Sequence, residues 1–336
     1  MNTEENQNYS PDTASNFESR IDLSELRQSI ENIKSEIAKV IVGQNQMVEH
    51  LLVALLSNGH VLIEGVPGVA KTITAKLLAK TVAVDFSRIQ FTPDLMPSDI
   101  LGTSVFNMKN TDFEFKKGPI FSNFILIDEI NRSPAKTQSA LFEVMEERQI
   151  TLDGKPYIME QPFLVIATQN PIEHEGTYRL PEAQLDRFLF KIEVGYPNLE
   201  QEIEIIKKQH ENKTEDKTEA VNQIISGEQL RKYQTIIKDI IIEQNLIEYI
   251  AKIIHNTREN PFLYLGASPR ASLALLVASK AFAGIRGRDF VTPEDIKESS
   301  LAVLRHRVIV SPEREMEGLT ADEIIRQILD GIEIPR

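Results

Sequence analysis

The sequence predicts an α/β domain built on a parallel sheet of five strands, followed by an all-helical domain. Short apolar runs lie between helical segments, and a glycine-rich loop joins the first run to a helix. Two further runs end in acidic or amide side chains. Because ligands of open parallel sheets bind at the carboxyl ends of the strands, we expect the loop and these side chains to form one site.

The elements are predicted in order from the amino terminus. Residues 1–20 are polar and acidic and are expected to be a disordered tail. The apolar spacing from Ile21 to about Asn58 is helical, with a short turn at 41–44 between two helices. The second of the five strand-like runs alternates more than the others and is expected near an edge. The runs are Val61–Ile63, Phe86–Phe91, Phe124–Ile127, Phe163–Ala167 and Phe188–Val194.

Two hairpins are predicted to interrupt this pattern. The segment Gln149–Met159 holds Asp153-Gly154 between β-prone residues. The segment Phe106–Phe115 carries Asn110-Thr111-Asp112 at its tip. Both are therefore expected to be antiparallel pairs outside the parallel sheet.

After Pro197 the sequence becomes helical. A polar run at 211–219 is expected to be a solvated loop, and Ser268-Pro269 and Thr292-Pro293 are predicted to start helices, each with a capping side chain followed by proline. The alanine- and leucine-rich run 271–283 is expected to pack inside the second domain. We therefore expect the α/β core at 21–198 and the helical domain at 199–336.

Composition limits the classes of protein to consider. The 336 residues allow two domains, and 41% hydrophobic with 26% charged residues is typical of a globular chain. The formal net charge of -13 argues against general binding to nucleic acid or anionic membranes. There is no cysteine, and no apolar stretch approaches the ~20 residues of a membrane helix. We expect a cytoplasmic protein without membrane insertion.

The glycine-rich loop reads GVPGVAKT over residues 65–72, and it matches the phosphate-binding pattern G-x-x-x-x-G-K-[ST] except at Ala70. Alanine fits there if the residue has the negative φ of a helix start. Loop N–H groups and the helix dipole would hold phosphates, with Lys71 on the β and γ phosphates and Thr72 on magnesium. A tight turn without a ligand is the alternative, which the flanking strand and helix disfavour. The expected nucleotide-binding residues of the loop are Gly65, Pro67, Gly68, Val69, Ala70, Lys71 and Thr72.

Polar groups at two other strand ends complete the predicted site. Asp128 would support the magnesium shell together with Thr72, and Glu129 would polarise the attacking water. Asn170 would orient that water or touch the γ-phosphate, or else cap a turn before Pro171. The sequence therefore predicts a site that binds ATP with Mg²⁺ and hydrolyses it.

Four arginines are weaker candidates, at positions 132, 179, 187 and 270. Any of them could lie on a solvated face. Arg270 differs because it lies in the first turn of a predicted helix, where the helix dipole disfavours a cation. Their spacing does not decide whether they reach a phosphate in their own subunit or in a neighbour. His60, at a strand start, is expected to be structural.

At this point the sequence resembles the MoxR-type AAA+ ATPases. The resemblance covers about Ile30 to the C-terminus and rests on strings that occur in a fixed order. They are GHVLIEGVPGVAKT at 59–72, QFTPDLMPSD at 90–99, IDEINR at 127–132, ATQNP at 167–171 and LPEAQLDRF at 180–188.

The resemblance implies an AAA+ P-loop core, a helical lid and a homo-oligomeric ring, typically hexameric, with ATP between subunits. It makes Lys71 and Thr72 Walker A residues, Asp128 and Glu129 the Walker B pair, and Asn170 sensor 1. It also makes Arg187 the arginine finger given to a neighbour's ATP, and Arg270 sensor 2, on either side of the interface. The segment 41–44, with Val42 and Gly43, would line the adenine pocket.

The family resemblance also implies a biological role. Segments 105–115 and 149–159 would be the helix 2 insert and the pre-sensor 1 hairpin, which face the pore or a client protein. MoxR-type proteins resemble chaperones that remodel clients, often with von Willebrand A domain partners. We expect a protein client and such a partner here.

Three alternatives remain open. An ATPase subunit of a magnesium chelatase would need a partner complex and a porphyrin. A nucleotide-dependent scaffold would bind ATP without turnover, which Glu129, Asn170 and Arg187 together disfavour. A nucleic-acid motor would need a basic channel, which the acidic net charge disfavours but to which four lysines could contribute, namely Lys109, Lys116, Lys117 and Lys155.

Overall fold

The computed structural model describes residues 21–335 except 110, 153, 172–176 and 212–216. The expected tail, Asn110 and Asp153 at the two predicted hairpin tips, and most of the expected polar loop at 211–219 therefore lie outside the described residues.

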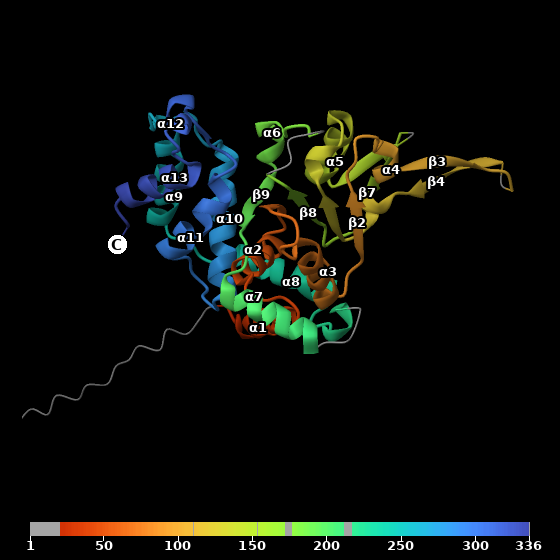
Figure 1. Ribbon diagram of the computed structural model, residues 1–336, viewed down its shortest axis with the longest axis horizontal. Helices are drawn as coiled ribbons and strands as arrows, with labels where there is room; N and C mark the ends of the chain where they lie inside the picture. Colours follow the sequence, from red (N-terminus) through yellow and green to blue (C-terminus); the bar gives the residue numbers. More distant parts are fainter. Residues whose placement is uncertain (1–20, 110, 153, 172–176, 212–216, 336) are drawn as a thin grey trace, which may run out of the picture.

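A parallel sheet of five strands forms the centre of the molecule (Figure 1). Its order is β2-β5-β8-β1-β9, and every neighbouring pair is parallel. The predicted five-stranded sheet is confirmed, and β2 lies at an edge as its alternating pattern indicates. The strands are β1 (His60–Gly65), β2 (Phe86–Gln90), β5 (Phe124–Asp128), β8 (Leu164–Gln169) and β9 (Phe188–Val194).

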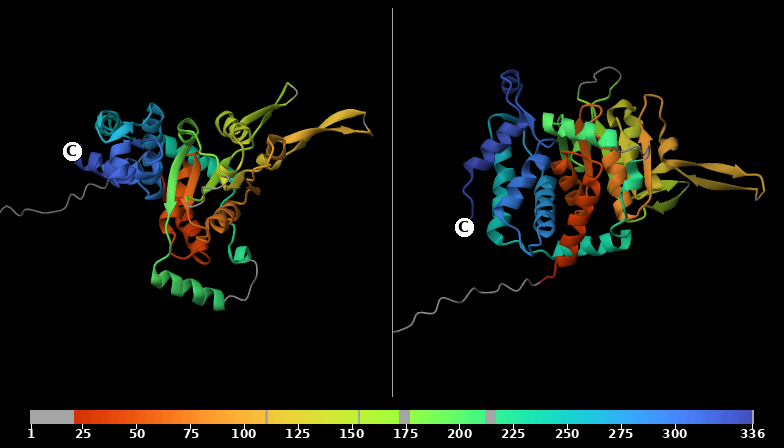
Figure 2. Two further views of the ribbon diagram at one scale, coloured as in Figure 1. Left: turned by 45° about the horizontal axis from the view of Figure 1, so that its top comes forward. Right: turned by 60° about the horizontal axis from the view of Figure 1, so that its bottom comes forward.

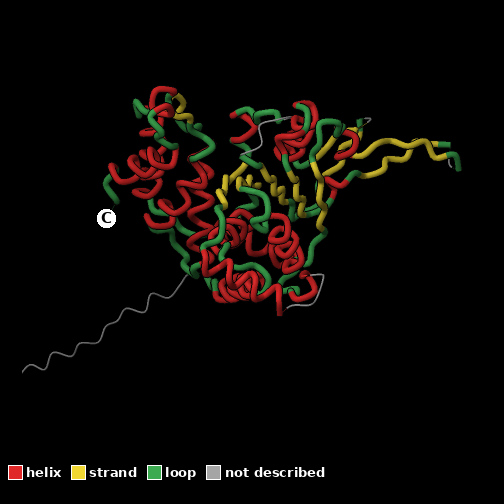
Figure 3. Tube along the Cα trace, in the orientation of Figure 1, coloured by secondary structure: helices red, strands yellow, loops and turns green. Residues whose placement is uncertain are grey.

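Both faces of the sheet are covered by helices, as Figure 3 shows by colour. Successive side chains of a strand point to opposite faces, so Val61 and Ile63 belong to one hydrophobic core while Leu62 belongs to the other. Burial on both faces explains why the central strands are continuously apolar. One face packs on α2 (Asn45–Leu56) and α3 (Lys71–Val82), and α1 (Ser24–Ala38) and α8 (Gly227–Asp239) pack in turn against these helices. The other face packs on α4 (Pro97–Leu101) and α5 (Ala135–Glu147).

The C-terminal part is helical, as predicted, and lies beside the β9 edge of the sheet (Figure 1). Helix α10 is at its centre, where Leu275 and Phe282 are fully buried. A short antiparallel pair joins the outer helices. These elements are α9 (Gln244–Glu259), β10 (Leu263–Leu265), α10 (Pro269–Ile285), α11 (Pro293–Leu304), β11 (Ile309–Val310), α12 (Pro312–Met316) and α13 (Ala321–Gly331).

The predicted starts of α10 and α11 are confirmed, but the predicted role of one capping residue is wrong. The side chain of Ser268 accepts no hydrogen bond from the first turn of α10, although its carbonyl oxygen accepts the N–H of Ala271 at 3.0 Å. Its Oγ donates instead to Asp186 Oδ2 at 2.8 Å, because the loop before β9 passes beside this helix start. At α11, the carboxylate of Asp295 accepts from the N–H of Thr292 at 2.9 Å.

Two antiparallel hairpins project from the core, which confirms both predictions (Figure 2). One pairs β6 (Gln149–Leu152) with β7 (Lys155–Ile158). The other pairs β3 (Gly102–Asn107) with β4 (Asp112–Lys117) and begins earlier than predicted. Its outer part exposes large apolar side chains, namely Val105, Phe106, Met108 and Phe113.

The remaining elements are short or peripheral. Helix α7 (Leu199–Glu211) crosses the outer surface of the α1–α2 layer and has no buried residue (Figure 2). The others are α6 (Glu182–Leu185) and the 3-10 turns η1 (Pro119–Phe121), η2 (Ile130–Arg132) and η3 (Lys217–Ala220).

Candidate functional site

The glycine-rich loop lies between the end of β1 and the start of α3, as predicted. Gly65 must be glycine because a Cβ there would lie 2.6 Å from the carbonyl oxygen of Val194 on β9. Gly68 has φ +87 with open space beside it. The loop therefore turns tightly and leaves its backbone accessible, as an anion-binding loop requires.

The expected backbone of Ala70 is wrong. Its φ is +63 and its ψ is 17, so it is left-handed rather than having the negative φ of a helix start. The physical reason is that this residue both closes the loop and starts α3. Its carbonyl accepts the N–H of Thr74 at 3.0 Å and the hydroxyl of the same residue at 2.9 Å.

Lys71 folds over the loop. Its Nζ donates to the carbonyl oxygen of Gly65 at 2.5 Å. Burial lowers the pKa of Lys71, while the nearby carboxylates of Asp128, Glu129 and Glu64 act in the opposite direction. The side chain is thus a partly desolvated cation at the loop, where an anion would pair with it strongly.

Asp128 ends β5 and is buried. Its Oδ2 lies 3.5 Å from the hydroxyl of Thr72, so the two predicted magnesium ligands face each other. The same oxygen accepts from Arg88 Nε at 2.6 Å, and Oδ1 accepts from the hydroxyl of Thr168 at 3.1 Å. Arg88 and Thr168 are not among the residues predicted from the sequence. Thr168 could have been found from its place at the end of the same apolar run, two residues before Asn170.

Glu129 follows directly, also with a left-handed backbone, at φ +58. Its N–H donates to the hydroxyl of Thr168 at 3.1 Å, which fixes the turn. Its Oε2 accepts from Gln90 Nε2 at 2.9 Å and lies 3.1 Å from Arg132 Nε. Arg132, an arginine candidate, therefore lies against the predicted base, and Gln90 is a contact that the sequence did not reveal.

Asn170 is buried directly after β8. The preceding residue, Gln169, is in register with Glu64 at the end of β1. Asn170 thus lies at the same edge of the sheet as the loop and Asp128. The predicted convergence of three strand ends is confirmed.

The predicted adenine segment forms the turn between α1 and α2. Val42 is buried, and Gly43 has φ +75. A Cβ on Gly43 would lie 2.4 Å from the side chain of Gln201 on α7. Glycine is therefore required here both by its backbone and by the close approach of α7.

Arg187 and Arg270 do not join these residues. Arg187 precedes β9, whose Phe188 is in register with His60, whereas its Val194 is in register with Gly65 at the loop. With a rise of about 3.3 Å per residue, this places Arg187 roughly 17–20 Å from the loop. It lies at the edge formed by the amino-terminal ends of the strands, opposite the edge formed by their carboxyl ends, where the loop lies.

The two arginines lie together at that opposite edge. Arg187 Nη1 donates to the carbonyl oxygen of Phe142 at 2.5 Å, and its Nε lies 3.8 Å from Glu146 Oε2. Arg270 Nη2 donates to Glu146 Oε1 at 2.7 Å. The remaining candidate, Arg179, is an exposed side chain 3.8 Å from Glu182.

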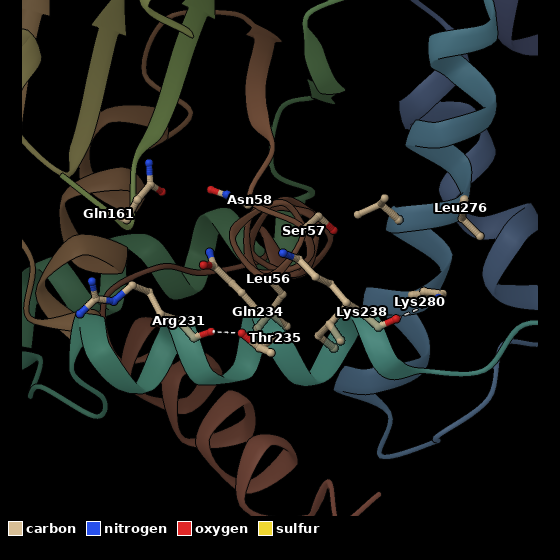
Figure 4. A pocket seen from close by; sticks show the side chains of 12 residues that line it. Leu56, Ser57, Asn58, Gln161, Arg231, Gln234, Thr235, Lys238, Leu276 and Lys280 are labelled. Carbon is tan, nitrogen blue, oxygen red and sulfur yellow. Dashed lines mark hydrogen bonds between the residues drawn. The ribbon is translucent and has the colours of Figure 1, made fainter. Parts of the chain in front are cut away.

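A separate cavity of about 370 Å³ lies between α2, α8 and α10 (Figure 4). It is lined by Leu56, Ser57 and Asn58, which precede β1, and by the basic side chains Arg231, Lys238 and Lys280. None of the predicted site residues lines it. Nor do the described helices include one with the length and apolarity of a membrane span.

Comparison with known proteins shows which families and relatives this chain resembles. The model of the ATPase family associated with various cellular activities matches residues 60–190, and that of the AAA lid domain matches 255–328. Chaperone MoxR1 of Mycobacterium tuberculosis is 45% identical, over 92% of this chain and 83% of the relative. The uncharacterized protein YeaC of Bacillus subtilis is also 45% identical, over 89% and 92%. A crystal structure from Cytophaga hutchinsonii is 44% identical, with a TM-score of 0.86, and covers 93% of this chain and 97% of its own.

Proposed function

This chain belongs to the MoxR-type AAA+ ATPases, and on that premise we propose that it hydrolyses ATP with Mg²⁺ and uses the reaction to remodel a client protein. The observation that carries the proposal is the meeting of Lys71, Thr72, Asp128 and Glu129 at one edge of the sheet. These side chains provide a cation, two metal-ligating oxygens and a base.

The residues fit the nucleotide and the metal. The loop is open at Gly68, and Lys71 provides a cation there. Thr72 and Asp128 face each other and would hold Mg²⁺, which when bound draws negative charge from the β and γ phosphates. Arg88 and Thr168 hold the carboxylate of Asp128 in place. Val42 and Gly43 would border the adenine, and Gly65, Pro67, Val69 and Ala70 would surround the phosphates.

Glu129 would accept a hydrogen bond, and then the proton, from the attacking water. Gln90 and Arg132 hold its carboxylate, and Asn170 at the neighbouring strand end would orient the water. Holding the base by two side chains from different segments limits its rotation, so that the carboxylate is positioned before the reaction.

Arg187 and Arg270 would act on the ATP of a neighbouring subunit. Their distance from the loop of their own chain supports this assignment, since an arginine side chain does not span roughly 17–20 Å. We propose a ring, typically hexameric, in which this edge faces the nucleotide of the next subunit. Guanidinium groups placed there stabilise the charge that develops during phosphoryl transfer.

The client would meet the β3–β4 hairpin, with the β6–β7 hairpin beside it. Exposed apolar side chains on a projecting hairpin support a protein contact, because they gain from leaving water. The relative named Chaperone MoxR1 supports the same role. We propose that a partner protein with a von Willebrand A domain takes part. Within this chain, we propose an ATPase core at 21–198 and a lid at 199–336.

The first test replaces the proposed base. Glu129→Gln keeps an oxygen that can accept from Gln90, so the fold should persist. We expect this variant to retain labelled ATP in the presence of Mg²⁺ but to release phosphate at least ~100-fold more slowly, the scale of losing a positioned base. Glu228→Gln makes the same change at an exposed side chain of α8 and should behave as wild type. Near-normal turnover in Glu129→Gln would remove Glu129 from the mechanism.

A further inference from the structure

One carboxylate lies between the two arginines at the edge opposite the loop. Glu146 is near the end of α5, and Arg270 is the second residue of α10. Glu146 Oε1 accepts from Arg270 Nη2 at 2.7 Å, and its Oε2 lies 3.8 Å from Arg187 Nε. A side chain of the core thus joins an arginine of the core to an arginine of the C-terminal helices.

Arg187 and Arg270 depend on this carboxylate to different degrees. Arg187 is also held by the carbonyl oxygen of Phe142 at 2.5 Å. Arg270, in contrast, has Glu146 as its only ion-pair partner among the described residues. The placement of Arg270 therefore depends mainly on Glu146.

Without Glu146, the positive charges around Arg270 would repel its guanidinium group. It lies in the first turn of α10, where the helix dipole repels a cation. It is also close to the guanidinium of Arg307, whose pKa is lowered first by burial and in part by Arg270. The negative charge of Glu146 offsets both repulsions.

We infer that Glu146 is a positioning residue, which holds Arg270 beside Arg187 so that both guanidinium groups meet the same triphosphate of a neighbouring subunit. This inference rests on the proposed function. The side chains of Glu146 and Arg270 are 39% and 44% exposed, and such ion pairs are weak. When a triphosphate binds, its greater negative charge can therefore replace Glu146 as the anionic partner of the guanidinium groups.

The first measurement is steady-state ATP hydrolysis. We expect Glu146→Gln to lower kcat about threefold to tenfold, the scale of one exposed ion pair. The Kd for ATP of the isolated subunit should not change, because Glu146 lies far from the loop of its own chain. Glu146→Asp, which keeps the charge, should restore part of the loss. In an Arg270→Gln background, Glu146→Gln should add less than about a twofold loss, because its effect passes through Arg270.

Glu147→Gln is the matched control. Glu147 is the next residue of α5, is exposed, and forms no ion pair with a described residue. Its kcat should equal that of wild type. Wild-type kcat in Glu146→Gln, or the same loss with and without Arg270, would overturn the inference.

A second measurement needs no nucleotide. Glu146→Gln and Arg270→Gln should each lower the midpoint of thermal unfolding by about 1–2 °C, and the double variant by no more than the larger single shift. Additive shifts would show that the two side chains do not interact, which would overturn the inference. Coupled shifts in a chain whose wild type releases no phosphate would overturn the proposed function, and with it the role of Glu146.

Discussion

At the scale of single residues, Ala70 and Glu129 share an uncommon backbone. Both are left-handed, at φ +63 and +58, although neither is glycine. This conformation costs roughly 1–2 kcal/mol for an L-residue and persists only where its surroundings hold it. The carbonyl of Ala70 is held by Thr74, and the N–H of Glu129 by Thr168. Two of the six non-glycine residues with positive φ in the described part of the chain therefore shape the proposed site.

His60 is structural, as predicted, and it links two strands to a helix. It is buried, accepts the N–H of Val165 on Nδ1 at 3.0 Å, and places Nε2 3.2 Å from the carbonyl oxygen of Met145. These partners require a neutral ring with its proton on Nε2. Burial, and then the charge of Arg148, lower the pKa of His60 to about 3.

This lowered pKa predicts a pH dependence of stability. Between pH 6.5 and 3 the unfolded chain binds a proton at His60 that the folded chain does not, so the free energy of unfolding falls as pH falls. At about 1.4 kcal/mol per pKa unit, the effect is on the order of several kcal/mol. His50 and His306 contribute in the same direction, because burial also lowers their pKa.

The test is His60→Gln, followed by urea unfolding at several pH values. We expect it to lower stability at pH 7 by about 1–3 kcal/mol, because Val165 loses a well-placed acceptor. We also expect a shallower fall of stability between pH 6.5 and 3, since one buried histidine is gone. His255→Gln on the exposed face of α9 should change neither quantity. An unchanged pH slope in His60→Gln would contradict the assignment.

At the scale of elements, the lid helices are tied to the sheet through Arg307. This residue follows α11 and is almost fully buried. It donates to Asp186 Oδ1 at 2.7 Å and to the carbonyl oxygen of Phe188 at 2.6 Å. Ser268, at the start of α10, donates to the other oxygen of the same carboxylate. Two lid helices are thus attached to the segment that carries Arg187.

This connection predicts a large loss of stability in Arg307→Ala. The change removes the cation that faces Asp186, which keeps only the hydroxyl of Ser268 as a donor, and it takes buried donors from the carbonyl oxygens around Phe188. Breaking such a buried pair costs about 3–5 kcal/mol. Arg326→Ala removes an arginine from an exposed pair with Asp322 and should cost less than about 1 kcal/mol. Denaturant unfolding of both variants measures the difference. An equal loss of unfolding free energy in the two variants would show that Arg307 does not attach the lid helices to the sheet.

At the scale of the whole molecule, the groups assigned to one reaction lie at opposite edges of one sheet. Lys71 and Asp128 lie at the carboxyl ends of the strands, and Arg187 lies before the start of β9. A single chain therefore does not bring them together. A head-to-tail ring would, because such an interface joins two different faces of the same chain.

Mixing two inactive variants tests this arrangement. Lys71→Ala and Arg187→Ala proteins should each be nearly inactive, but a mixture should recover part of the activity. An intact interface needs a subunit with Lys71 on one side and a subunit with Arg187 on the other. In a random 1:1 mixture each of these occurs half of the time, so roughly a quarter of the interfaces have both groups. Phosphate release is measured after mass analysis has shown mixed rings. No recovery in such rings would mean that Arg187 does not act between subunits.

The sheet, the loop and the acidic strand end could be predicted because each depends on residues that are neighbours in the sequence. The loop at 65–72 and Asp128-Glu129 each follow directly from an apolar run, and parallel strands bring such ends to one edge. Arg88 and Gln90 could not be assigned, because their role depends on β2 lying beside β5 in register. The sign of φ at Ala70 was wrong, because a pattern of residue types does not show which way a loop closes.

The sequence by itself determined that this chain has a glycine-rich loop of the phosphate-binding pattern, that one strand ends in two acidic residues, and to which family the chain belongs. These features depend on residues that are neighbours in the chain. The tertiary structure alone decided that Arg187 and Arg270 share Glu146, and that they lie far from the loop. Arg270 and Glu146 are 124 positions apart. Contacts at that separation depend on the order and register of strands and on helix packing, which neighbouring residues do not specify.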